Sequence, residues 1–130
     1  MVPAYFDEQG RPKVKIEVSG LWKRGFIDAL FDTGHSGELS LPVSILIEIG
    51  APVKGVQLVE YADGRKAYEL VFPVLVFIEG EQRTVSATLT GSSQPIAGTQ
   101  LFNNHKVLID FIRKQLVIVN DNDASMQGNP

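Results

Sequence analysis

Residues 53–90 are rich in Val, Leu, Phe, Ile and Tyr, and this apolar stretch is broken at two turn signals, 62–64 and 79–81. Asp63-Gly64, in the first break, is a strong hairpin signal because Gly readily adopts the backbone that tight turns require. Three long runs joined by two such turns predict antiparallel strands. Pro73 predicts an edge or a bulge in the second run, since Pro donates no backbone hydrogen bond. We therefore expect a mostly β chain with a hairpin arm projecting from its core.

Both ends of the chain carry further strand signals. Polar and apolar residues alternate over 13–19, which places three apolar side chains on one face of a half-buried strand. Residues 2–6 are apolar and lead into the turn 7–10, so they predict a hairpin with that strand. The runs 107–112 and 115–119 predict two more strands around a turn.

The middle of the chain mixes strands with short helices. Residues 25–31 are mostly apolar and predict a more buried strand that ends at a loop of turn formers. A short strand at 39–41 follows. Pro42 can be the first residue of a helix that residues 43–49 continue, and the Gly directly after them can end it. Thr99 could cap a second short helix.

Length and composition favour one compact domain. The chain has 130 residues, of which 44% are hydrophobic, enough to bury a core. We assign residues 1–119 to this domain and expect 120–130, which are polar and lack apolar spacing, to form a flexible C-terminal tail.

Charge and hydropathy exclude several classes of partner. The net charge is -3 and no basic cluster occurs, so nucleic acid is not an expected partner. No segment approaches the roughly 20 apolar residues of a membrane-spanning helix, and the first ten residues do not resemble a signal peptide. A cytoplasmic protein without a membrane partner is the expectation.

The chain contains no Cys and two His residues, His35 and His105. Disulfides, thiolate catalysis and sulfur-ligated metals are therefore excluded, and two distant His residues do not make a metal site. Any chemistry must come from oxygen groups.

The most informative oxygen groups are in Asp32-Thr33-Gly34, which follows the apolar Ala29-Leu30-Phe31. Three later features accompany this motif: the Asp63-Gly64 hairpin tip, the apolar-apolar-Gly element 96–98 and the closing strand 107–111. In this order the sequence resembles the retropepsin-like aspartic peptidases, in particular the short, single-domain bacterial kind. The resemblance extends from Lys13 to about Val119 and implies a mainly β, closed barrel-like retropepsin (acid protease) fold with one or two short helices.

The resemblance also implies roles for individual residues. Asp32 would be the catalytic carboxylate, Thr33 would hydrogen bond across the two copies, and Gly34 would donate its N–H to the carboxylates. Residues 96–98 would support this loop from behind. The flap tip that closes over an extended peptide or protein substrate would comprise Tyr61, Ala62, Asp63, Gly64 and Arg65. The sequence departs from better-known members at His35, which stands in place of a small residue.

The chemistry can be argued separately from the resemblance. Two carboxylates about 3 Å apart share one proton, because both cannot easily ionise. The ionised carboxylate can deprotonate a water while its protonated partner donates to the substrate carbonyl. The sequence holds one Asp-Thr-Gly, so the second Asp32 must come from an identical copy across a two-fold axis. A homodimeric endopeptidase that needs no cofactor is the leading hypothesis.

Other interpretations stay open. Asp28 and Asp110 are alternative carboxylates, although an exposed or hydrogen-bonded structural role is commoner for strand residues. His35 could titrate near Asp32 or simply be an exposed loop residue, and we assign it no catalytic role. The chain could also form a dimer that binds peptides or proteins without cutting them, or act as a monomeric β-barrel interaction module.

Overall fold

The computed structural model describes residues 1–120 of the chain, and these are mainly β. The elements are β1 (Ala4–Phe6), β2 (Pro12–Ser19), β3 (Arg24–Phe31), β4 (Leu39–Pro42), α1 (Val43–Ile49), β5 (Gly55–Glu60), β6 (Lys66–Ile78), β7 (Glu81–Thr90), β8 (Ile96–Ala97), the 3-10 helix η1 (Thr99–Phe102), β9 (His105–Asp110) and β10 (Gln115–Asn120). The tail predicted for 120–130 lies outside the described residues, except for Asn120. Asn120 pairs with His105 as the last residue of β10, so this strand includes one residue that the sequence assigned to the tail.

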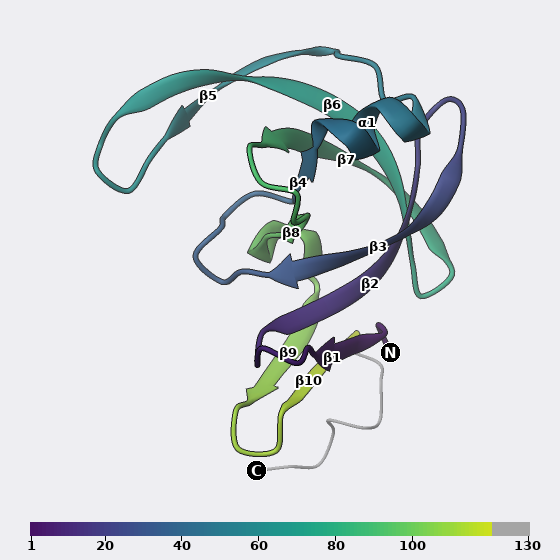
Figure 1. The fold of residues 1–130 in the computed structure, drawn as a ribbon, viewed down its shortest axis with the longest axis vertical. Coiled ribbons are helices and arrows are strands. Elements are labelled where there is room, and N and C mark those ends of the chain that lie inside the picture. The colour runs from purple at the N-terminus through teal and green to yellow at the C-terminus, as the bar shows by residue number, and fades with distance from the viewer. Residues whose placement is uncertain (121–130) are drawn as a thin grey trace.

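The large sheet is partly ring-like (Figure 1). Its strand order is β1-β2-β3-β8-β4-β7-β6-β5, and an additional pairing of β2 with β6 brings its two halves together. The hairpins predicted from local turn signals, β1–β2, β5–β6 and β6–β7, are all antiparallel neighbours. The pairings that close the ring join segments far apart in the sequence, such as Val18 with Val76.

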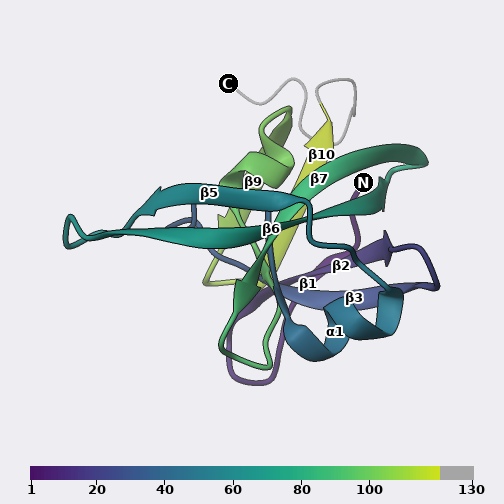
Figure 2. The same ribbon diagram turned by 90° about the horizontal axis from the view of Figure 1, so that it is seen from above.

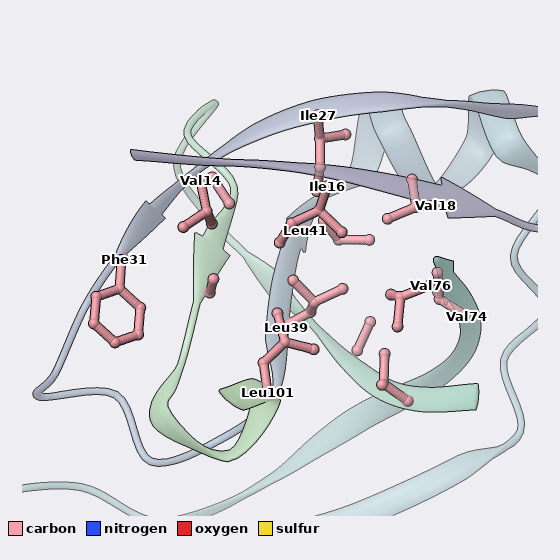
Figure 3. Close-up of a cluster of buried hydrophobic side chains, with 14 of the residues drawn as sticks. Val14, Ile16, Val18, Ile27, Phe31, Leu39, Leu41, Val74, Val76 and Leu101 are labelled. Atoms are coloured by element: carbon pink, nitrogen blue, oxygen red, sulfur yellow. The ribbon is translucent and has the colours of Figure 1, made fainter. Parts of the chain in front are cut away.

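The core lies inside this ring. Figure 3 shows side chains from β2, β3, β4, β6 and η1 pointing into one interior. Val14, Ile16 and Val18, which the alternation placed on one face, are 0%, 1% and 0% exposed. Burial of apolar surface stabilises the folded state by about 25 cal/mol per Å². The strands packed around this core therefore hold the connecting loops in defined positions.

The sequence predicts a more buried strand over 25–31, but β3 buries only one of its two faces. Ile27, Ala29 and Phe31 are buried, but Phe26 is 64% exposed and Asp28 is exposed. Solvent reaches the outer face of this strand, so its side chains alternate in burial although its sequence is almost continuously apolar.

The two short helices occur where the sequence predicted them, with different first residues. Pro42 is extended and is the last residue of β4, so α1 begins at Val43 rather than at the proline. Thr99 is the first residue of η1, and the capping position is occupied by Gly98, whose lack of a side chain allows a close approach described below.

The β5–β6 hairpin projects from the rest of the molecule as an arm (Figures 1 and 2). β6 pairs with β5 as far as Val71 and with β2 from Leu75 onward. Pro73 lies between these two ladders, on an edge of β6 that has no strand partner at this position. Its missing N–H therefore costs no hydrogen bond between strands. The predicted edge position of this proline is therefore confirmed.

Candidate active site

Asp32 is the first residue after β3, at the mouth of a loop that runs to β4. Its N–H donates to the carbonyl oxygen of Ala97 in β8 at 3.0 Å, which fixes the backbone where the strand ends. The side chain is half-buried, and its Oδ1 accepts the Gly34 N–H at 2.9 Å. A carboxylate that receives a backbone N–H has a defined orientation, while its other oxygen is available to a second group.

The loop after Asp32 is supported from behind by the segment 96–98. β8 lies between β3, with which it is parallel, and β4, with which it is antiparallel. Gly98 donates its N–H to the Glu38 carbonyl at 2.9 Å, and Thr99 donates to the His35 carbonyl at 2.9 Å. A Cβ on Gly98 would collide with the Gly37 carbonyl oxygen. The supporting position predicted for this segment is therefore present, and it depends on glycine.

His35 contributes to the floor of the site rather than protruding into solvent. Its ring is half-buried, with Nε2 3.4 Å from the Ser40 Oγ. Ser40 in turn lies 2.8 Å from the Thr88 Oγ1, and both hydroxyl residues are buried. The suggestion that His35 is an exposed loop residue is thus wrong, because the loop folds its ring inward against β4.

A cleft of about 590 Å³ opens between this loop and the projecting hairpin. The lining residues come from the loop and β4 (Gly34 to Ser40), from the hairpin (Gln57, Val59, Glu60, Tyr61, Ala62, Glu69), and from β7, β8 and the segment between them (Ser86, Thr88, Leu89, Thr90, Gly91, Ile96). Figure 1 shows the β5–β6 arm above the loop that follows β3. Asp32 lies beside this lining, next to Gly34. The arrangement suits an extended ligand held between the arm and the loop.

The five residues predicted at the flap tip divide into two groups. Tyr61 and Ala62 line the cleft, whereas Asp63, Gly64 and Arg65 lie outside its lining. Asp63 accepts the backbone N–H of Arg65 at 3.0 Å and its Nε at 2.7 Å, so its carboxylate stabilises the turn itself. Gly64 has a φ of +87°, a conformation that favours glycine. Asp63 and Gly64 therefore shape the turn, and Tyr61 and Ala62 are the two of the five predicted residues that line the cleft.

Thr33 is exposed beside Asp32. Within residues 1–120 its hydroxyl has no hydrogen-bond partner. A group placed in this way is available to a second molecule.

Sequence reasoning missed the three carboxylates that line the cleft, Glu38, Glu60 and Glu69. Glu69 Oε1 accepts the Tyr61 hydroxyl at 2.9 Å, and this hydrogen bond raises the pKa of Tyr61 above its ordinary value. The pairing of Gln57 with Glu69 and of Val59 with Ala67 places these residues on the inner face of the hairpin. Strand alternation counted outward from the Asp63-Gly64 turn could have identified that face.

The alternative carboxylates have structural roles. Asp28 is exposed and accepts the Tyr5 hydroxyl at 2.9 Å. Asp110 binds the backbone of the β9–β10 turn through Ile112 and Arg113. His105 lies in β9 with its Nε2 2.8 Å from Glu79 Oε1. Within the described part of the chain, no group of three His, Cys, Asp or Glu side chains is placed to hold a metal ion.

Comparisons with known proteins add no family assignment: no protein-family model matches the chain, and no curated protein matches it. None of the helices in residues 1–120 is both long enough and apolar enough to cross a bilayer. The function must therefore be argued from the site.

Proposed function

We propose that this chain is one subunit of a homodimeric aspartic endopeptidase, in which Asp32 and the partner's Asp32 activate a water together. The observation that carries the proposal is the setting of Asp32. Asp32 follows a core strand, its side chain accepts the Gly34 N–H at 2.9 Å, and its own N–H donates to the Ala97 carbonyl. It lies beside a cleft of about 590 Å³ that is lined on one side by the β5–β6 hairpin. The exposed Thr33 provides a surface through which a second copy could complete the site.

The proposed reaction uses the pair as base and acid. The ionised carboxylate takes a proton from the water, whose oxygen attacks the peptide carbonyl carbon, while the protonated carboxyl donates to the carbonyl oxygen. The resulting tetrahedral intermediate collapses as its C–N bond breaks. One carboxyl gives its proton to the departing amine, and the other takes a hydroxyl proton from the intermediate as the carbonyl forms again, so the pair returns to its singly protonated state. Carboxylates held about 3 Å apart share one proton for this purpose.

The hairpin would hold the substrate over this pair. A peptide in extended conformation can form backbone hydrogen bonds with neighbouring strands while its side chains alternate between subsites. The apolar cleft residues Leu39, Val59, Leu89 and Ile96 would receive apolar side chains near the scissile bond. No cofactor is needed for this chemistry.

The test is cleavage of a mixed peptide library by concentrated protein between about pH 4 and 7, a range that spans raised carboxylate pKa values. An Asp32→Asn variant is assayed beside the native protein. We expect native cleavage with apolar residues around the cut site and a loss of at least about 1000-fold in the variant, because both carboxylates of the site that the two copies share become amides. If the native protein is dimeric by mass yet cuts nothing, the peptide-binding dimer replaces this proposal. If it is strictly monomeric at high concentration, the interaction module does so.

A further inference from the structure

The charges on the cleft are one-sided. Its lining contains three carboxylates, those of Glu38, Glu60 and Glu69, and no Lys or Arg among the described residues that form it. His35 is the one lining residue that can become cationic. A cleft lined by one sign of charge concentrates ligands of the opposite sign, since its low-dielectric walls focus the field.

Glu38 holds one carboxylate oxygen toward β7 and leaves the other open. Its Oε1 accepts the Ser86 N–H at 3.0 Å, and Ser86 also lines the cleft. Within residues 1–120, neither Lys nor Arg forms an ion pair with Glu38. The residue is half-buried, so water screens its charge less than it would at a fully exposed site.

Glu69 is arranged in the same way on the opposite wall. It belongs to the inner face of the hairpin, and its Oε1 accepts the Tyr61 hydroxyl at 2.9 Å. It too is half-buried and has no Lys or Arg in ion-pair contact within the described part of the chain. Each wall of the cleft thus presents a carboxylate that is oriented by a neutral donor and keeps one oxygen for a ligand.

Two cations follow the turn of the hairpin, Arg65 and Lys66, and both are placed beside other carboxylates. Arg65 at the hairpin tip forms an ion pair with Asp63 at 2.7 Å. Lys66 is the cross-strand partner of Glu60, and Glu60 is exposed. Glu38 and Glu69 are therefore the two lining carboxylates that are half-buried, and water screens their charge less than that of Glu60.

We propose that the cleft selects peptides with a Lys or Arg side chain next to the apolar residues at the scissile bond, and that Glu38 and Glu69 are the specificity-determining residues. This inference rests on the proposed peptidase function. In a dimer each residue would occur twice, once on each side of the two-fold axis.

The experiment starts from any peptide that the native protein cuts. Three versions are made that differ at one flanking position, with Lys, Gln or Glu, and kcat/KM is measured at low and high salt. We expect Lys to be favoured over Gln by about tenfold and Gln over Glu, with the ratios shrinking in about 1 M salt, as for other rim charge pairs. The Glu38→Gln and Glu69→Gln double variant should lose most of the Lys preference. Glu8→Gln, a change in the exposed β1–β2 turn, should retain it.

A binding measurement separates this inference from the proposed function. Fluorescent Lys, Gln and Glu peptides are titrated with Asp32→Asn protein, whose folding is checked by circular dichroism. Tighter binding of the Lys peptide, lost on adding the two Glu→Gln changes, supports the inference even if nothing is ever cut. Cleavage without charge preference would overturn the inference and leave the peptidase proposal standing. Equal binding of all three peptides by an intact, uncleaving protein would overturn it as well.

Discussion

At the residue scale, Asp110 shows how a carboxylate can shape a turn without taking part in chemistry. Its Oδ1 accepts the N–H groups of Ile112 and Arg113, each at 3.0 Å, and its Oδ2 lies 3.1 Å from the Arg113 guanidinium. The backbone hydrogen bond from Arg113, followed by its side-chain bond, holds the pKa of Asp110 below its ordinary value of 3.8. The sequence predicts that this strand continues to Ile112. β9 ends at Asp110 instead, because these bonds turn the chain there.

The lowered pKa of Asp110 predicts a specific pH dependence of stability. A group with a depressed folded pKa stabilises the protein above its unfolded pKa and loses this contribution as the pH falls through the folded pKa. We therefore expect Asp110→Ala to lower the thermal midpoint modestly at neutral pH, and the difference from native protein to shrink below about pH 4. Asp110→Asn keeps an acceptor oxygen and should be intermediate at neutral pH. Thermal unfolding followed across pH tests this, and a constant native-to-Ala difference would contradict it.

Local sequence signals identified some site residues and missed others for a physical reason. Asp32 and Gly34 are marked by their order in the chain, and the structure brings them within hydrogen-bond distance. Glu38 and Glu69 are 31 positions apart in the sequence (69 − 38). No local pattern shows that both line one cleft. Their meeting depends on how the hairpin folds back over the loop, which is set by the tertiary fold.

At the element scale, the crossing of β8 behind the Asp32 loop depends on one residue. Gly98 is buried, and any side chain there would meet the Gly37 carbonyl and the His35 ring. We expect Gly98→Ala to cost about 2–4 kcal/mol of stability, since backbone atoms must move to admit the methyl group, and to abolish cleavage by displacing the loop. Gly91→Ala is the matched control, because a Cβ there meets nothing within 4 Å. Urea unfolding of both variants tests the prediction, which fails if their midpoints shift equally.

The hairpins were predictable at this scale, but the ring was not. Turn residues such as Asp63-Gly64 set the pairing of adjacent strands, as the register from Gly55–Val71 to Glu60–Lys66 confirms. The two-residue β8 contains too few residues to carry a strand signal, and it was predicted only as a supporting segment. The pairing of β2 with β6 joins strands that many residues separate, so it follows from packing and not from local periodicity.

At the scale of the whole molecule, exposed apolar side chains gather at the terminal hairpin. Leu108, Phe111 and Ile112, in and just after β9, are 48%, 60% and 91% exposed. Ile112 and Phe111 form part of the turn that Asp110 organises. Apolar residues this accessible would gain from burial against another molecule. Burial of these side chains against a second copy of the chain would stabilise the proposed pairing of two Asp32 residues.

Mixing native and inactive chains tests that requirement directly. If each active site needs an Asp32 from both subunits, Asp32→Asn chains added to native protein will form mixed dimers with one carboxylate and withdraw native chains from productive pairs. We expect activity at constant native concentration to fall progressively, and to fall by about half when equal amounts are fully exchanged into random dimers, because half of the native chains then pair with an inactive one. An Asp32→Asn chain that also carries a disrupted association surface, such as Ile112→Asp, should inhibit less if that surface takes part in dimerisation. If each chain acts alone, added Asp32→Asn protein will leave the rate unchanged, and the shared dyad would have to be abandoned whatever the mass of the protein in solution.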